Sequence, residues 1–234
     1  MCANYRPGAR DTIARLMAAR WRDDRAYPDE AYPGSLAPML RKAPDGELEW
    51  CTAVFGLVPS WAKDLNFARK TYNARTETVA SKPSYRNAWR HAQWCLVPMA
   101  AFFEPSYQTG KPVRWRIERA DHEIFMIAGI WEAWRERAAT GTAAAAAAGS
   151  AGSAQWLLSF SLLTVNADRH PLMQRFHAPV DEKRSIAIAP VPGWLDASPA
   201  EVLAMLATPS ADAFVAAPDP RVRRSTTAVA RSVT

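Results

Sequence analysis

The alternation of apolar and polar residues along this chain predicts mostly β-structure. Residues 113–119 alternate cleanly, and an apolar stretch at 124–130 follows a polar turn, so we expect these two segments to pair as a hairpin. The prolines within 27–44 predict an extended loop. Apolar, β-branched or aromatic runs predict further strands at 47–57, 95–103, 156–165 and 185–189.

The helical patterns are fewer and shorter. Residues 11–26 have apolar side chains at helical spacing behind Asp11, which is a suitable N-cap. A second helix is expected around residues 85–89. A third is predicted from Ser198 onward, because Ser198 and Glu201 have the spacing of a capping box.

Many strands and few helices indicate an α+β fold, which we expect to be a mainly antiparallel, barrel-like β-sheet flanked by short helices. The chain has 234 residues, of which 49% are hydrophobic, so residues 1–234 are predicted to form a single domain around one core. Residues 138–154 consist of Ala, Gly, Ser and Thr, and we expect a disordered insertion there. The arginine-rich C-terminal tail is expected to be mobile.

Charge and composition make a polyanionic partner plausible and disfavour a membrane protein. The net charge is +6, and ten tryptophans supply aromatic faces that can stack on unpaired bases. No apolar run approaches the roughly 20 residues that a membrane helix needs. The first residues also lack the apolar stretch of a secretory signal, so we expect a cytoplasmic protein.

Cys2 is the candidate nucleophile of the chain. The three cysteines are widely spaced, which supports neither a disulfide framework nor a metal site, and Cys51 and Cys95 lie in apolar segments typical of buried cysteines. If Met1 is removed, Cys2 carries both an α-amine and a thiol. An amine attacks an aldehyde to give a Schiff base, and a thiol on the neighbouring carbon can close onto that imine as a thiazolidine ring.

Three other polar features suit the same chemistry. Glu104 ends an apolar run, where partial removal from water favours a role in proton transfer. His177 lies in a loop between predicted strands, as a general acid or base often does. The polar cluster at 73–77 interrupts an aromatic region. Taken singly, these features are more typical of a solvated strand end, a surface histidine and an exposed turn.

Taken in order, these motifs resemble the SOS-response-associated peptidase (SRAP) family of abasic-site processing proteins, over most of the chain. The matching motifs are Met1-Cys2, Ala37-Pro38, Phe55-Gly56-Leu57-Val58-Pro59-Ser60-Trp61, Asn73-Ala74-Arg75-Thr76-Glu77, Phe103-Glu104 and the loop that carries His177.

The resemblance implies an abasic-site sensor that forms a covalent thiazolidine link to single-stranded DNA, with an associated autopeptidase and lyase-like activity. Its implied catalytic residues are Cys2, Asn73, Glu104 and His177. Its implied DNA-binding residues are Arg75, Trp61, Asn4 and Arg6. It further implies no cofactor and no metal, a monomer, and association with the nucleoid when the protein is bound to DNA.

Several positions depart from the family pattern. Ala3 and Asn4 replace a Gly-Arg pair after the cysteine, which removes a cationic phosphate contact that Arg6 could replace. Pro105 follows Glu104 where the family often has tryptophan, and the histidine loop is longer before Arg184.

Two other functions fit parts of the pattern. An N-terminal-nucleophile hydrolase of the amidotransferase kind would use Cys2 to attack an amide, although no motif for a glutamine pocket is visible. A non-covalent single-strand-binding module would need only the basic and aromatic residues. A member of the family that has lost its activity through the changes after Cys2 is a third alternative.

Overall fold

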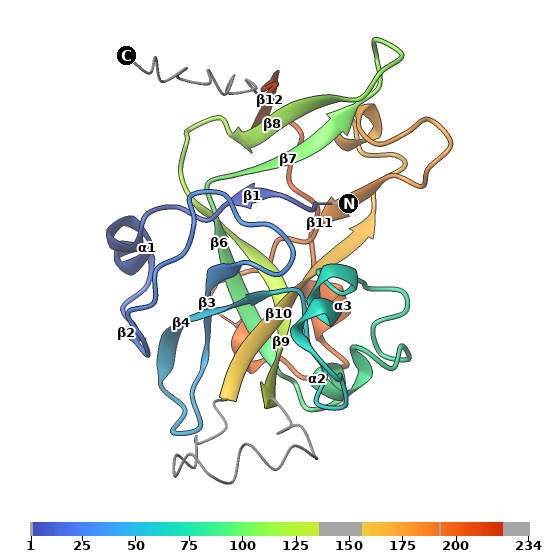
Figure 1. Cartoon of the computed structure of the whole chain (residues 1–234). Coiled ribbons are helices and arrows are strands. Elements are labelled where there is room, and N and C mark those ends of the chain that lie inside the picture. The colour runs from blue at the N-terminus through green and yellow to red at the C-terminus, as the bar shows by residue number, and fades with distance from the viewer. Residues whose placement is uncertain (1, 136–155, 192, 222–234) are drawn as a thin grey trace, which may run out of the picture.

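The computed structural model describes residues 2–135, 156–191 and 193–221. Within these ranges, five strands close into a barrel at the centre of the molecule (Figure 1). They are β3 (Leu36–Lys42), β4 (Leu48–Phe55), β6 (Trp94–Met99), β9 (Phe125–Arg135) and β10 (Trp156–Asn166). The order is β10-β9-β6-β3-β4, and the parallel pairing of β4 with β10 closes the ring.

Three short strands extend this sheet beyond the barrel. β11 (Arg184–Ile186) is antiparallel to β10, β2 (Arg20–Trp21) is parallel to β4, and β5 (Asn73–Arg75) is parallel to β10. The pairing of β5 places Asn73 beside Leu162 on the barrel wall.

A second, four-stranded antiparallel sheet lies over one end of the barrel, at the top of Figure 1. Its order is β1 (Tyr5–Arg6), β7 (Ala101–Ser106), β8 (Val113–Arg119) and β12 (Phe214–Pro218). Tyr5 pairs with Phe102, so the N-terminal segment lies next to the strand that carries Glu104.

The helices are short and lie around the sheets. They are α1 (Arg10–Leu16), α2 (Arg86–Arg90), α3 (Val202–Met205) and the 3₁₀ turns η1 (Leu65–Lys70), η2 (Met173–Arg175) and η3 (Trp194–Asp196). Among the residues described, no helix has both the length and the apolar character that a membrane crossing needs.

Aromatic packing inside the barrel connects the N-terminus to the segment before β5. Phe55 stacks on Phe160 with ring centroids 5.5 Å apart, and the rings of Tyr5 and Tyr72 meet Phe55 edge-on. Because Tyr5 follows Cys2 by three positions and Tyr72 precedes Asn73, this packing fixes both chain segments at one place.

Gly56 turns the chain out of β4 toward Trp61. Its φ is +113°, a backbone conformation that residues with a Cβ rarely adopt, and a Cβ there would lie 2.0 Å from the carbonyl oxygen of Ala68. The turn and the close approach of the two backbones therefore both require glycine.

The fold class is confirmed: the molecule is mainly β, with a closed barrel and few short helices. The strands predicted at 47–57, 113–119 and 156–165 and the short helix around 85–89 are present. The strand predicted at 185–189 is shorter, as β11. The predicted insertion at 138–154 and most of the C-terminal tail lie outside the described residues.

Two helix predictions were too long. α1 ends at Leu16 because the following residues turn extended and Trp21 stacks on Trp50, which draws Arg20 and Trp21 into a strand. Asp11 lies in the first turn of α1, and its predicted capping bond is not formed. The Ser198–Glu201 interaction does form, at 2.9 and 2.6 Å, but α3 starts only at Val202.

The strand predictions were wrong in three places. The loop expected at 27–44 contains β3, a buried barrel strand that the prolines concealed. The run at 95–103 divides at Ala100 into β6 and β7, which belong to different sheets. The expected hairpin does not exist, because β8 pairs with β7 and β12 while β9 pairs with β6 and β10.

Candidate active site

Asn73 holds the backbone of Cys2. Its Nδ2 donates to the carbonyl oxygen of Cys2 at 3.0 Å, and its own carbonyl accepts a hydrogen bond from the Tyr85 hydroxyl at 3.0 Å. The side-chain oxygen Oδ1 of Asn73 is buried and has no hydrogen-bond partner among the described residues. It is therefore an acceptor available to a donor on Cys2 or on a bound ligand.

The thiol of Cys2 is buried, with 1% of the residue exposed, and its Sγ lies 3.5 Å from the carbonyl oxygen of Asn4. Burial, and after it the negative charge of Glu104, raise the pKa of the Cys2 thiol far above its usual value. The environment thus favours a neutral thiol.

Glu104 and His177 form a buried pair. His177 Nε2 lies 2.9 Å from Glu104 Oε2, and both residues are at least nine-tenths buried. The backbone N–H of His177 donates to the carbonyl of Pro105 at 2.8 Å, so the histidine loop is tied to the strand that carries Glu104. The arrangement joins a carboxylate and an imidazole, which can exchange a proton directly.

His177 has an unusual backbone conformation. Its φ is +65°, which is uncommon for a residue with a Cβ. Lys183 supports the loop there, because its Nζ donates to the carbonyl of Ala178 at 2.6 Å.

A cavity of about 490 Å³ opens beside this pair. Glu104 and His177 line it, together with Ala3 and Asn4 directly after Cys2. The other lining residues are Phe103, Pro105, Tyr107, Pro112, Arg114, Ala178, Asp181 and Arg221. The structure therefore brings Cys2, Asn73, Glu104 and His177 together at one end of the barrel.

The side chains of Asn4 and Arg6 bond to other groups of the protein. Asn4 is buried, its Oδ1 accepts from Arg114 at 2.9 Å, and its Nδ2 donates to a backbone carbonyl. Arg6 pairs with Glu30 at 3.2 Å and lies over the Phe103 ring. Burial opposes the ionisation of Glu30, but hydrogen bonds from Tyr32 and Arg114 outweigh it and lower the pKa of Glu30 to about 2.

Arg114 is a residue that the sequence motifs did not single out. Its guanidinium lies 3.4 Å from the centre of the Phe103 ring and bonds to Asn4, Glu30 and Asp219. The only signal in the sequence is its place in an alternating strand, which does not distinguish it from other charged strand residues.

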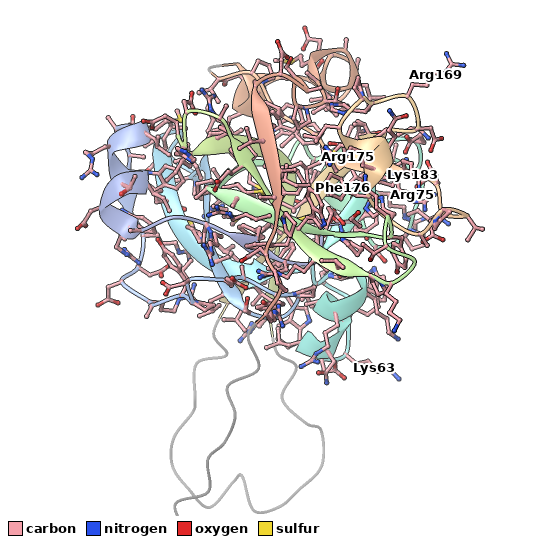
Figure 2. The ribbon with its side chains drawn as sticks, turned by 90° about the horizontal axis from the view of Figure 1, so that it is seen from above. Lys63, Arg75, Arg169, Arg175, Phe176 and Lys183 are labelled. Atoms are coloured by element: carbon pink, nitrogen blue, oxygen red, sulfur yellow. The ribbon has the colours of Figure 1, made fainter. Side chains whose placement is uncertain are left out.

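Arg75 lies at the surface, where its guanidinium pairs with Glu182 at 2.8 Å. Figure 2 shows Arg75 and Lys183 on the same side of the molecule. Beside this pair, Arg184 is buried and binds both carboxylate oxygens of Glu77 at 2.9 Å. The bond between Arg184 and Glu77 fixes the end of the 73–77 motif against β10 and β11.

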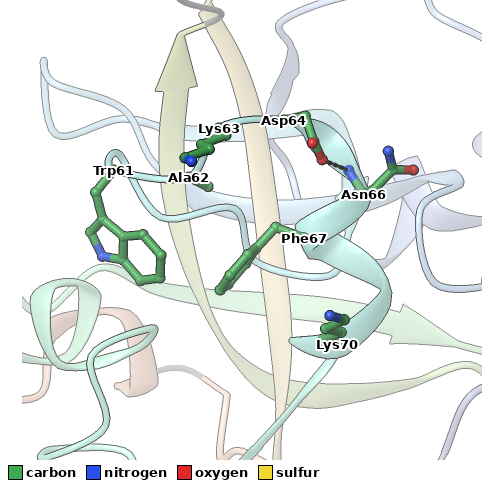
Figure 3. A pocket seen from close by; sticks show the side chains of 7 residues that line it. All are labelled: Trp61, Ala62, Lys63, Asp64, Asn66, Phe67 and Lys70. Carbon is green, nitrogen blue, oxygen red and sulfur yellow. Dashed lines mark hydrogen bonds between the residues drawn. The ribbon is translucent and has the colours of Figure 1, made fainter.

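Trp61 is half-exposed and lies on a separate cavity of about 410 Å³ (Figure 3). Its ring meets the ring of Phe67 edge-on, with centroids 5.0 Å apart. The other lining residues are Ala62, Lys63, Asp64, Asn66 and Lys70. This cavity shares no lining residue with the one beside Glu104, but the segment that forms it leads directly into β5.

Within the described ranges, no group of three or more His, Cys, Asp or Glu side chains is placed to hold a metal ion. The buried His170 has a structural role, since its Nδ1 accepts from the backbone N–H groups of Leu172 and Met173.

Comparisons with known proteins bear on the family and the fold of this chain. The model of the SOS response associated peptidase (SRAP) family matches residues 1–222. Two relatives match this chain over 90 residues, which is 38% of its length. The chain is 36% identical there to the abasic site processing protein YoqW of Bacillus subtilis (strain 168) and 34% identical to the abasic site processing protein YoaM of the same strain. The matched region spans only 38% and 37% of the length of these two relatives.

Solved structures match over nearly the whole chain. A protein from Bordetella bronchiseptica has a TM-score of 0.79 at 30% identity, covering 94% of this chain and all of that one. A protein from Bacteroides thetaiotaomicron has a TM-score of 0.71 at 18% identity, covering 92% of this chain and 90% of that one, which shows the fold alone.

Proposed function

Since the chain belongs to the SOS response associated peptidase (SRAP) family, we propose that it detects abasic sites in single-stranded DNA and crosslinks to them through Cys2. The observation that carries the proposal is the convergence of two pairs: Asn73 binds the backbone of Cys2, and the Glu104–His177 pair lines a cavity together with Ala3, the residue after Cys2. The names of the relatives YoqW and YoaM support abasic sites as the target.

The first step frees the α-amine of Cys2. Hydrolysis of the peptide bond between Met1 and Cys2 consumes one water and releases methionine. This cleavage is the autopeptidase step of the proposal, and Glu104 or His177 is placed to activate the water, since the two line the cavity next to Ala3.

The amine then attacks the aldehyde carbon of the ring-opened abasic deoxyribose. A carbon–nitrogen bond forms, and loss of the hydroxyl as water, with proton donation from the Glu104–His177 pair, gives an imine. Asn73 Oδ1, which lacks a partner among the described residues, can accept a hydrogen bond from the amine while Nδ2 holds the carbonyl of Cys2.

Ring closure completes the link. The thiol sulfur adds to the imine carbon, and its proton passes to the imine nitrogen, which gives a thiazolidine without a further leaving group. Because burial keeps the thiol neutral, the proton must leave as sulfur attacks. Glu104, whose charge acts on the thiol, is the acceptor that the structure offers.

The DNA strand is held outside this chemistry. Arg75 sits two residues after Asn73 and would exchange Glu182 for a phosphate oxygen, and Trp61 offers a half-exposed ring for stacking on a base. In this proposal Asn4 acts indirectly, by fixing the N-terminal segment through Arg114.

The test mixes the purified protein with a single-stranded oligonucleotide that carries one abasic site, followed by a denaturing gel. We expect a shifted band in the parent and in a Cys51→Ala control, and no band in Cys2→Ala. Intact mass should equal protein lacking Met1 plus DNA minus one water.

Protein whose N-terminus is confirmed as Cys2 but which gives no band would overturn the crosslinking proposal. Retained binding of the intact strand would then favour the non-covalent module, for which the Trp61 cavity is the relevant observation. Glutaminase activity without DNA would favour the amidotransferase alternative.

A further inference from the structure

Residues 63–90 have a large excess of positive charge. Residues 63–90 contain seven Lys or Arg residues against Asp64 and Glu77, a net charge of +5 where the whole chain has +6. The seven cationic residues are Lys63, Arg69, Lys70, Arg75, Lys82, Arg86 and Arg90.

All seven cationic side chains of this segment are exposed. Within the part of the chain that the structure describes, Arg75 is the only one of the seven with an ion pair. The charge of the other six is therefore available to an external anion, whereas Arg114 and Arg184 are neutralised by carboxylates of the protein.

Three of these cations form a row along the outward face of α2 and the turn before it. Lys82, Arg86 and Arg90 are spaced by four residues, which places them on one side of a helix. The N–H of Arg86 donates to the carbonyl of Lys82 at 2.9 Å, so the helical turn extends back to Lys82. The opposite side of the helix is buried through Ala88 and Trp89, which leaves the row facing solvent over roughly 12 Å.

The row begins next to the candidate active site. Tyr85, between Lys82 and Arg86, donates its hydroxyl hydrogen to the carbonyl of Asn73, whose side chain binds Cys2. In Figure 1, α2 lies toward the end of the barrel away from the N-terminus, so the row leads away from Cys2. Along the chain, the residues of the Trp61 cavity precede Asn73 and the cationic row follows it.

We propose that Lys82, Arg86 and Arg90 bind the phosphate backbone of the DNA strand that flanks the abasic nucleotide on one side. This inference rests on the proposed function, because it uses the same DNA strand. It assigns to α2 a role that the sequence motifs and the family resemblance do not.

The physical chemistry of the row favours a polyanion. Like charges four residues apart on a helix repel and destabilise it by a few tenths of a kcal/mol per pair, a cost that phosphates between them reverse. An anionic membrane is disfavoured, because an interfacial helix also needs an exposed apolar face. The exposed large hydrophobic residues of the described chain all lie outside 78–91.

The experiment measures the salt dependence of binding to an unmodified single-stranded oligonucleotide, in a Cys2→Ala background so that no crosslink can form. Each phosphate contact contributes about 0.7 to the slope of log K against log salt for single strands. The variant Arg86→Gln/Arg90→Gln should lower the slope by about 1.4 and weaken binding at low salt. Glutamine retains good helix propensity.

The matched control is Arg15→Gln/Arg22→Gln, which removes the same charge from exposed positions outside the segment. An equal slope in parent and α2 variant, or an equal loss in the control, overturns the proposal. If the double variant does not fold, Lys82→Gln, which lies before α2, tests the same contact and should lower the slope by about 0.7.

Two further arms separate the possible failures. With abasic oligonucleotides shortened from the 5′ or the 3′ side, the difference between parent and α2 variant should vanish for only one side. Loss of binding to anionic phosphatidylglycerol vesicles, with DNA binding unchanged, would contradict the assignment. The slope is measured in a variant that cannot crosslink. The result of this test therefore does not depend on whether Cys2 reacts with abasic sites.

Discussion

Asn73 donates a hydrogen bond to the backbone carbonyl of Cys2 at 3.0 Å, across 71 residues of sequence. This bond connects the N-terminal segment to β5, which is itself paired in parallel with β10. The position of the candidate nucleophile is therefore set by the barrel wall, although Cys2 stands outside every strand and helix of the described chain.

Replacement of Asn73 by Ala should slow crosslinking and leave the fold intact. A neutral hydrogen bond contributes about 0.5–1.5 kcal/mol, so loss of the Asn73–Cys2 bond predicts a roughly two- to tenfold lower rate. Asn73→Asp should not restore the rate, because a carboxylate cannot donate to the carbonyl of Cys2. The crosslinking rate is measured on denaturing gels under single-turnover conditions at saturating DNA. A rate equal to that of the parent in both variants would contradict the role of Asn73.

Replacement of Glu104 by Gln should make the thiol of Cys2 ionise at lower pH. The negative charge of Glu104 is the second cause, after burial, that raises the pKa of this thiol. Removing the charge lowers that pKa, so at a given pH a larger fraction is thiolate. The pH profile of alkylation by iodoacetamide should shift toward lower pH.

Glu132→Gln is the control for this experiment, because Glu132 is also a buried carboxylate but its partner is Asn87 at 2.7 Å. If Glu104→Gln and Glu132→Gln give the same alkylation profile as the parent, the electrostatic coupling between Glu104 and Cys2 is refuted. The crosslinking rate of Glu104→Gln should fall at the same time, since the proton acceptor is lost.

Arg184→Met should destabilise the protein by about 2 kcal/mol. The side chain of Arg184 is 2% exposed and donates to Glu77, Glu182 and Thr164, so its loss leaves the buried carbonyl of Thr164 without this donor. Urea unfolding at neutral pH measures the change. Arg119→Met, which breaks only the exposed pair with Asp121, should cost less than about 1 kcal/mol. Equal costs for the two variants would argue against a structural role for Arg184.

Trp61→Ala should weaken the binding of single-stranded DNA with little effect on stability. Stacking of one base on an aromatic ring is worth about 1–3 kcal/mol, which corresponds to a roughly five- to 150-fold change in affinity. Fluorescence anisotropy with an abasic-free oligonucleotide measures it. Trp156→Ala provides the comparison, since Trp156 is equally exposed but lies at the start of β10; a similar loss there would mean that the effect is not specific to the Trp61 cavity.

Local patterns predicted individual elements well where one segment determines its own structure. β8 coincides with the predicted strand at 113–119, because apolar and polar residues alternate along it. The prediction failed where pairing between strands determines the structure. β3 contains Pro38 and was predicted as part of a loop, but it forms a strand because β4 and β6 pair with it on both sides. Strand partners are chosen by contacts between distant segments, which no local pattern contains.

The candidate site divides in the same way. Cys2, Glu104 and His177 could be named from their residue types and from the order of motifs, and the family prediction is confirmed. The Glu104–His177 distance of 2.9 Å could not be predicted, because it joins β7 to a loop 73 residues later. Nor could the burial of Asn4 under Arg114, which depends on how β1 and β8 lie on either side of β7.

The sequence by itself determined the chemical groups of this protein, its family, its mainly β character and the excess of positive charge in residues 63–90. The tertiary structure alone decided which of those groups meet. The barrel closes through the parallel pairing of β4 with β10. β5 pairs with β10 and binds Cys2 through Asn73, while the N-terminal segment and the histidine loop line one cavity. The physical reason is that reactivity belongs to residue type, whereas proximity is produced by packing between segments far apart in the chain.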